Sequence, residues 1–259
     1  MADNVTLLGL AGSLVAGLAT GVGALPVFFL REITNQTQAI LLGFGAGVML
    51  AATSFSLVLP GVEAAQNQTG NPFAAASIVV VGILFGGAFL WAANRFLPHE
   101  HFVKGREGGN LERLKQVWLF VIAITLHNFP EGLAVGVGFG GGDVANGIAL
   151  TLGIGLQNFP EGLVVAIALL SQGYVKCDVF GVALLTGLAE PIGGVIGASL
   201  VSIASFILPW GMAFAAGAML FVISDEIIPE SHSLGTEKQA TIGVMIGFVL
   251  MMFLDVTLG

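Results

Sequence analysis

The chain alternates long apolar stretches with short polar breaks along its whole length. A membrane-spanning helix needs about 20 mostly apolar residues, and the sequence contains eight stretches of that size. We expect helices at residues 5–29, 38–59, 74–97, 115–139, 144–170, 178–204, 207–229 and 239–258. The breaks between them, such as REITNQTQ, EAAQNQTGNP and GFGGGD, are rich in residues that favour turns. The pattern predicts an all-α, polytopic membrane protein with eight transmembrane helices.

Only one polar break is sizeable, the loop at residues 98–113 between the third and fourth spans. The spans and loops use up the chain, so we expect a single transmembrane domain over residues 1–259. Composition agrees, because 9% of the residues are charged where a soluble domain has about 25%. Membrane lipid is therefore the expected surrounding. The net charge of −8 and the absence of a basic patch give no reason to expect a nucleic-acid partner.

The basic residues indicate the orientation, because lysine and arginine favour the cytoplasmic side of a membrane. All eight fall on one side of the expected spans: Arg31, Arg95, Lys104, Arg106, Arg113, Lys115, Lys176 and Lys238. We therefore expect the loop at 98–113 in the cytoplasm and both termini outside it.

Parts of the sequence repeat one another. Residues 14–25 align with 184–195 at an offset of 170, and residues 43–50 align with 213–220 at the same offset. Spans 1–3 are thus related to spans 6–8, and span 4 is related to span 5 by LHNFPEG and LQNFPEG. Related spans cross the membrane in opposite directions, which predicts an inverted repeat typical of secondary transporters. Chance likeness among Gly- and Ala-rich helices is the alternative, and two blocks sharing one offset argue against it.

The repeated hexapeptide places polar side chains deep in the membrane. His127 and Glu131 lie on one helical face because they are four residues apart, and Gln157 and Glu161 repeat this spacing. Counting about 1.5 Å per residue from Lys115 puts His127 roughly 18 Å into a core of about 30 Å. The hexapeptides therefore lie near the middle of the membrane.

Glu190 is expected at the same depth in span 6, where no lysine or arginine is available to neutralise it. An ionised side chain there costs roughly 2.5–3.5 kcal/mol on insertion scales. The carboxyl groups are therefore either protonated or visited by a cation. Imidazole and carboxylate ligands suit Zn²⁺ and its first-row neighbours. A polar network that only holds helices together is the alternative.

The motifs HNFPEG in span 4, QNFPEG in span 5 and EPIGG in span 6 resemble those of the ZIP family of zinc- and iron-regulated-type metal transporters, in particular its bacterial GufA-like branch. The likeness covers essentially the whole chain. It implies a divalent metal ion transporter that carries Zn²⁺, and also Cd²⁺, Fe²⁺ or Mn²⁺, into the cytoplasm by alternating access. It further implies a bacterial plasma (inner) membrane location and no organic cofactor, and it is compatible with assembly as a homodimer.

The resemblance also implies a metal site. Its first part would be His127, Glu131, Gln157 and Glu161, with Met49 close by, and its second part Asn128, Glu131, Asn158, Glu161 and Glu190. One departure concerns Asn158, because some relatives have aspartate at this position. A neutral amide would weaken the second part, so whether one or two metals bind stays open.

Other polar residues lie where an ion would enter or leave. The candidates for an entrance are Glu63 and Asp255, and Ser56 and Thr53 are candidates for lining the pathway beside Met49. The candidates for an exit are Asp225, Glu226, Glu230, His232, His99 and His101. Solvated helix ends and loops are the alternative for both groups.

Two other functions compete with metal transport. An intramembrane metalloenzyme is one, because His127 and Glu131 share the spacing of zincin histidines, but the sequence contains no HExxH motif. Proton transport through shared carboxylates is the other. We expect a transporter and not an enzyme.

Overall fold

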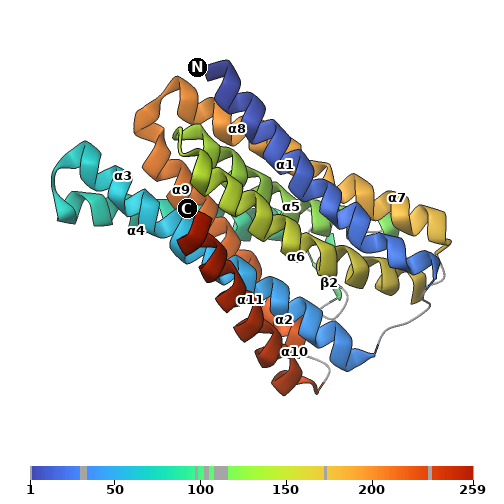
Figure 1. The fold of residues 1–259 in the computed structure, drawn as a ribbon. Coiled ribbons are helices and arrows are strands. Elements are labelled where there is room, and N and C mark those ends of the chain that lie inside the picture. Colours follow the sequence, from blue (N-terminus) through green and yellow to red (C-terminus); the bar gives the residue numbers. More distant parts are fainter. Residues whose placement is uncertain are drawn as a thin grey trace.

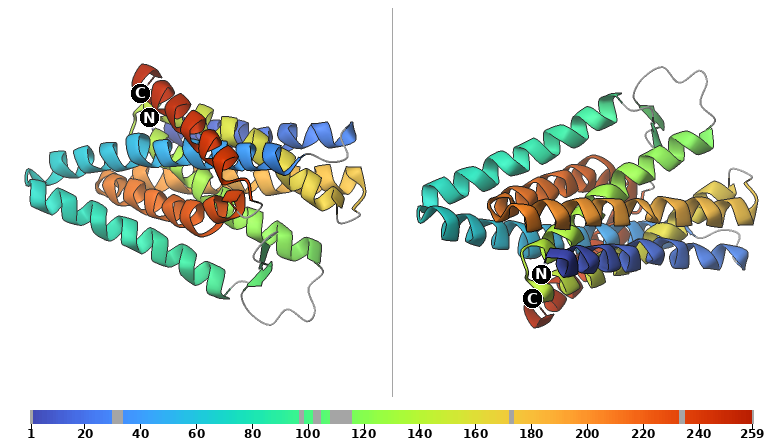
Figure 2. Two further views of the ribbon diagram at one scale, coloured as in Figure 1. Left: turned by 90° about the horizontal axis from the view of Figure 1, so that it is seen from below. Right: turned by 90° about the horizontal axis from the view of Figure 1, so that it is seen from above.

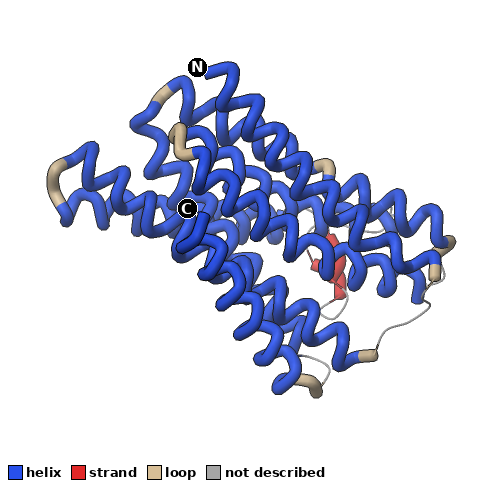
Figure 3. Tube along the Cα trace, in the orientation of Figure 1, coloured by secondary structure: helices blue, strands red, loops and turns tan. Residues whose placement is uncertain are grey.

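The structure is a computed structural model, and it describes residues 2–29, 34–96, 99–101, 105–107, 116–171, 174–232 and 235–258. Nearly all of them are helical, with a single small pair of strands in the described residues (Figures 1 and 3). The main helices are α1 (Ala2–Ala24), α2 (Asn35–Ala51), α3 (Leu59–Thr69), α4 (Pro72–Phe96), α5 (Gln116–Gly140), α6 (Val144–Ser171), α7 (Lys176–Gly187), α8 (Ala189–Ile203), α9 (Leu208–Val222), α10 (Ile228–His232) and α11 (Glu237–Leu258).

The helices have the length and composition of membrane spans. Within the described residues, seven helical stretches are long and apolar enough to cross a bilayer. Helix α5 adds another stretch of 25 residues, which also exceeds the length that a span requires. Large apolar side chains are exposed on α4 and α11, among them Leu84, Phe85 and Met245, as expected for surfaces that face lipid. The prediction of an all-α polytopic membrane protein is confirmed.

The second span is longer than the sequence pattern suggests. We expected it to end near residue 59, but helix α3 continues to Thr69 and turns only at Gly70, whose φ is 65°. Alanine and glutamine dominate the extension, and both are good helix formers. The segment EAAQNQTGNP is therefore mostly helix, and its break is limited to its last residues.

Two spans change from α-helix to π-helix partway along. The first π-helical segment, η2 (Ala52–Val58), joins α2 to α3, and the second, η4 (Ile223–Ile227), joins α9 to α10. A proline follows each of them, Pro60 in α3 and Pro229 in α10. Proline has no backbone N–H and cannot close the bond to the carbonyl four residues before it. A π-helical turn is one way in which a helix accommodates such a loss, and it often marks a functional position.

The short strands β1 (His99–His101) and β2 (Gly105–Glu107) form an antiparallel hairpin in which Glu100 pairs with Arg106. They belong to the loop predicted at residues 98–113. Strand β1 contacts α5, and Figure 2 shows the hairpin beside the start of that helix. The hairpin is the only departure from helix among the described residues, apart from turns and linkers.

The helices pack as two groups. Helices α1, α5, α6, α7 and α8 pack against one another, and we call them the first unit. Helices α2, α3, α4, α9, α10 and α11, with η2 and η4, form the second unit. Contacts between the units run mainly through α2 with α6, α5 with α9, and α6 with α11. Figure 1 shows the first unit at upper right and the second at lower left.

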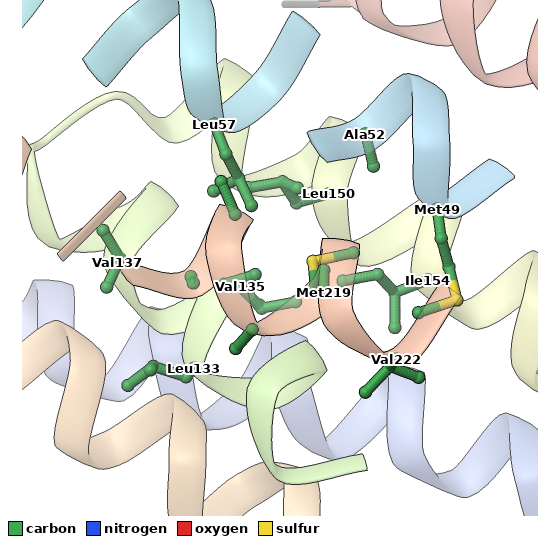
Figure 4. Close-up of a cluster of buried hydrophobic side chains, with 14 of the residues drawn as sticks. Met49, Ala52, Leu57, Leu133, Val135, Val137, Leu150, Ile154, Met219 and Val222 are labelled. Carbon is green, nitrogen blue, oxygen red and sulfur yellow. The ribbon is translucent and has the colours of Figure 1, made fainter. Parts of the chain in front are cut away.

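Both termini lie at the same end of this bundle (Figure 2). The turns between α5 and α6 and between α8 and α9 lie there too (Figure 1), and we call this the terminal end. A large buried apolar cluster packs near it, drawn from both units and including Met49, Leu57, Leu150, Ile154 and Met219. Figure 4 shows these side chains interleaved between helices of the two units.

Candidate metal-binding site

The site is built on α5 and α6, the two helices that carry the repeated hexapeptide. Each remains a single helix across its internal proline, Pro130 in α5 and Pro160 in α6. Helix α8 approaches α5 closely, because a Cβ placed on Gly132 would lie 2.0 Å from the carbonyl oxygen of Glu190. Only glycine allows this approach. The contact brings Glu190 to the level of Glu131.

Gln157 lies between two of the carboxylates. Its side-chain nitrogen Nε2 donates a hydrogen bond of 2.6 Å to Oε1 of Glu131 on α5. The same nitrogen is 2.8 Å from Oδ1 of Asn158 and 3.4 Å from Oε2 of Glu161. An amide nitrogen has only two hydrogens for these three acceptors, so the longest contact, to Glu161, is the weakest. Gln157 and Glu131 are both buried.

Asn158 continues this network to α8 and α1. Its side-chain nitrogen Nδ2 donates to Oε1 of Glu190 at 2.6 Å and to the backbone oxygen of Ala16 at 2.9 Å. Both hydrogens of the amide are therefore used, and its oxygen accepts from Gln157. Two amide groups thus link three carboxylates from three different helices.

The start of α8 positions Glu190. Helix α7 ends at Gly187, the chain turns at Leu188, and α8 begins at Ala189. This places Glu190, which is fully buried, in the first turn of α8. A helix N-terminus favours a negative charge, which offsets part of the cost of burial. Glu131 and Glu161 also interact electrostatically with Glu190, and three neighbouring carboxylates repel each other when ionised.

Several oxygen atoms in the cluster have no hydrogen-bond partner among the described residues. They are Oε1 of Gln157, Oε2 of Glu190 and Oδ1 of Asn128. The side-chain nitrogen of Asn128 also has no hydrogen-bond partner among these residues. An unsatisfied buried polar atom costs about 1–3 kcal/mol. These oxygens are acceptors of the type that bind cations, so the donor chemistry of the cluster fits a divalent metal ion.

No group of three His, Cys, Asp and Glu side chains is arranged to hold a metal ion within the described part of the chain. Two features account for this. Amide nitrogens stand between the carboxylates, and much of the predicted donor set is Gln or Asn. The side chain of His127 lies outside the described residues. The predicted ligand set therefore stays a prediction, although Glu131, Gln157, Asn158, Glu161 and Glu190 are connected by the hydrogen bonds above.

Met49 and Thr53 face the interior from the second span. Met49 is 1% exposed and belongs to the large apolar cluster, where Figure 4 shows it near Ile154. Thr53 lies one turn further along, in η2, and is also 1% exposed. Its hydroxyl has no hydrogen-bond partner among the described residues. Met49 lies on the face of the second unit that meets the first.

The residues predicted at the entrance and along the pathway do not form one group in the structure. Ser56 and Asp255 are in direct contact, because the Ser56 hydroxyl donates to Oδ1 of Asp255 on α11. Glu63 instead lies on α3 and is exposed. Ser56 is buried and Asp255 is half-buried. Glu63 takes no part in their contact through any hydrogen bond that the described residues reveal.

The predicted exit residues lie around η4 and α10. Asp225 and Glu230 are half-buried, while the side chain of Glu226 lies outside the described residues. Nδ1 of His232 is 2.9 Å from both the Ser231 hydroxyl and the Ile228 carbonyl. His99 and His101 form part of β1, and their side chains also lie outside the described residues.

Asn146 is among the polar residues of the interior that sequence reasoning missed. It is 4% exposed, and its side-chain nitrogen Nδ2 donates to the carbonyl oxygen of Ser56 at 3.1 Å. Its backbone N–H donates to Oδ1 of Asp143, the residue that caps α6. The sequence did contain an indication, because Asn146 is an amide close to the start of an otherwise apolar span. The same position is equally typical of a solvated residue at a helix end.

Comparison with known proteins agrees with this architecture. Residues 100–255 match the model of a family described as ZIP zinc transporter. The chain is 49% identical to zinc transporter GufA of Myxococcus xanthus, with 97% of this chain and 99% of that protein covered. It is 46% identical to zinc transporter ZIPB of Bordetella bronchiseptica, covering 93% and 78%, and 34% identical to human zinc transporter ZIP11, covering 93% and 94%. The chain therefore belongs to the ZIP family, in its bacterial GufA-like branch.

Proposed function

We propose that the chain carries Zn²⁺, and also Cd²⁺, Fe²⁺ or Mn²⁺, across the membrane into the cytoplasm through the cluster on α5, α6 and α8. Membership of the family supports divalent metal transport, with zinc in the names of the relatives. The same relatives are named as transporters, and the protein is a transporter and not an enzyme. The observation that carries the proposal is the set of three carboxylates linked by two amides, of which Glu131 and Glu190 are buried and Glu161 is half-buried.

A cation would replace the amide donors in this set. Nε2 of Gln157 now supplies partial positive charge to Glu131 and Glu161, and a metal ion between the same oxygens would supply far more. A half turn of the Gln157 amide would present Oε1 in place of Nε2. That oxygen has no hydrogen-bond partner among the described residues. The proposed ligands are thus His127, Glu131, Gln157 and Glu161 for one ion, with Met49 beside them.

The second part of the site would use Asn128, Glu131, Asn158, Glu161 and Glu190. Asn158 is the weak member, because its amide already donates to Glu190 and Ala16. It contributes no negative charge, so a metal held there would be bound less firmly than in a site with aspartate. Looser binding suits a carrier, since it must release its ion.

Repeated close approaches support an inverted repeat as the basis of the site. A Cβ on Gly132 would lie 2.0 Å from the carbonyl oxygen of Glu190, and a Cβ on Gly162 would lie 2.0 Å from that of Thr20. Gly162 is 30 residues after Gly132, and Glu190 is 170 after Thr20, which are the two offsets of the sequence repeat. The π-helical segments are centred on residues 55 and 225, also 170 apart.

The packing of the two units supports alternating access. The first unit holds every residue of the linked carboxylate and amide network, and the second unit contributes Met49 and Thr53. Movement of one unit past the other would carry the site from one side of the membrane to the other. We place the terminal end outside the cytoplasm, following the distribution of lysine and arginine, in a bacterial inner membrane. Assembly as a homodimer stays a prediction.

Reconstituted uptake tests the proposal directly. Purified protein in liposomes should accumulate Zn²⁺, and unlabelled Cd²⁺, Fe²⁺ or Mn²⁺ should compete with it. His127→Ala and Glu161→Ala should reduce uptake by at least about a hundredfold, because each removes a ligand of the transported ion. Glu237→Gln is the matched control, since this exposed carboxylate lies at the start of α11, far along the chain from the site.

Two outcomes would contradict the proposal. Uptake that survives both substitutions would remove the cluster from the pathway. Proton currents that persist after complete removal of divalent metals, without any metal uptake, would favour the competing function of proton transport.

A further inference from the structure

Pro60 removes the α-helical hydrogen-bond donor of the Ser56 carbonyl. In a regular helix the carbonyl of residue 56 would accept the N–H of residue 60, but proline has none. Ser56 lies in the π-helical segment η2, and Pro60 follows in the first turn of α3. A hydrogen bond from another donor to this buried carbonyl is therefore favourable.

Asn146 supplies that donor from the other unit. Its Nδ2 lies 3.1 Å from the Ser56 carbonyl oxygen, and both side chains are buried. Only the nitrogen of the amide can donate to a carbonyl, so the orientation of the Asn146 side chain is fixed by this contact. The hydrogen bond from the backbone N–H of Asn146 to Oδ1 of Asp143 places Asn146 in the first turn of α6.

Ser56 also bonds to its own unit, because its hydroxyl donates to Asp255 on α11. Its backbone carbonyl thus bonds to the first unit and its side chain to the second. Leu57 and Leu150, neighbours of these residues in sequence, belong to the apolar cluster that both units share near the terminal end. In such surroundings a broken hydrogen bond is not replaced by water as long as the units stay together.

We propose that Asn146 is a positioning residue that holds the two units together on the terminal side of the site, and that its bond to the Ser56 carbonyl must break each time the site opens to that side. The inference rests on the proposed alternating access. It assigns to one side chain a share of the free energy that keeps the terminal side closed.

A thiol introduced near the bond between Asn146 and Ser56 can report whether the units have separated on the terminal side. Thr53 lies three residues before Ser56 on the same helical segment and is buried, and its hydroxyl makes no bond among the described residues. Cys177 is the sole cysteine, so Thr53→Cys in a Cys177→Ser background carries one thiol. In lipid nanodiscs a water-soluble maleimide reaches both faces, which makes the test independent of membrane orientation.

Asn146→Leu and Asn146→Ala should each raise the labelling rate of this thiol by about tenfold, the effect of losing one buried hydrogen bond in the closed form. Leucine fills the volume of asparagine without donating, so it separates the hydrogen bond from packing. Thr151→Ala is the control, because within the described part of the chain its hydroxyl bonds only to the Gly147 carbonyl of α6. Labelling of this variant should stay at the parent rate.

Labelling of the leucine variant at the parent rate would overturn the proposal, as would an equal rise in the Thr151→Ala control. Zinc uptake measured on the same preparations separates this result from the proposed function. If the wild-type protein, measured alongside, takes up no zinc, the proposed function fails whatever the labelling shows. If the parent transports zinc and only the labelling is unchanged, the role of Asn146 alone is wrong.

Discussion

The two sides of the polar cluster are packed differently. On the terminal side, the large apolar cluster joins both units, and every residue that α5, α6 and α8 contribute to it lies between the polar cluster and the terminal end: Leu133, Ala134, Val135, Val137, Phe139, Leu150, Ile154 and Val201. On the opposite side, the second buried cluster is confined to the first unit, within the described residues. It includes Val27, Val165, Ile167 and Val179.

This difference indicates which side is closed. Where apolar side chains of both units interleave, water and ions are excluded and the units cannot separate without exposing that surface. Where the buried cluster belongs to one unit, that unit can move as a body without disrupting it. This is the packing that the proposed carrier would have when closed on its terminal side, with α6 and α7 supported from within their own unit on the other.

The largest effect is expected from fixing the closed side permanently. In a Cys177→Ser background, Ser56→Cys and Asn146→Cys introduce two thiols across the interface, at positions now joined by a hydrogen bond. Oxidation, or a short bifunctional thiol reagent, should reduce zinc uptake by at least about tenfold, because the units can no longer separate. Reduction of a disulfide should restore it. Each single cysteine variant is the control, and full uptake by protein shown to be cross-linked would contradict the comparison.

A second effect is expected at the polar cluster itself, which lies between the two sides. Asn158→Asp replaces the neutral amide by a carboxylate beside Glu190, so the second part of the site should bind Zn²⁺ about tenfold more tightly, as calorimetry would measure. Without metal the same variant should be less stable by about 1–3 kcal/mol, because aspartate cannot donate to Glu190 or to the Ala16 carbonyl. Unchanged affinity together with unchanged stability would argue against the assigned role of this position.

Matched cavities in the two apolar clusters would sharpen the comparison further. Leu150→Ala and Ile167→Ala each remove a buried aliphatic side chain, one from the shared cluster and one from the confined cluster. Both should lower thermal stability, by about 2–5 kcal/mol. Only Leu150→Ala should also raise labelling of the thiol at position 53, by roughly threefold. Equal labelling of the two variants would mean that the shared cluster does not control closure.

The smallest expected effect is the absence of labelling at Cys177 in intact cells. Cys177 is exposed, and it follows Lys176 at the start of α7. If the terminal end faces outward, a membrane-impermeant maleimide added to intact cells should leave Cys177 unmodified, and permeabilised cells should be labelled. Labelling of intact cells would reverse the orientation, and with it the proposed direction of transport.

Much of the fold could be predicted because the bilayer imposes it on the sequence. A span must be apolar over about 20 residues, so helix positions can be read from composition alone. Polar residues within such a span are costly, and this made His127, Glu131, Glu161 and Glu190 conspicuous. The helical period then showed which of them share a face.

Partners between helices could not be predicted in the same way. Spacing places Gln157 and Glu161 on one face but does not reveal that the Gln157 amide would bond to Glu131, 26 residues earlier. The extension of the second span to Thr69 and the hairpin in the long loop were also missed, since amide-rich and charged segments are compatible with either helix or loop.

The sequence by itself thus determined the spans, the depth of the polar residues and the pattern of the repeat, because each depends on local composition and on distance along one helix. Only the tertiary structure decided which amide lies between which carboxylates, and that Asn146 meets the carbonyl of Ser56. These contacts depend on the rotation and depth of helices relative to one another. Many small packing terms set those quantities together, and no single segment of the chain encodes them.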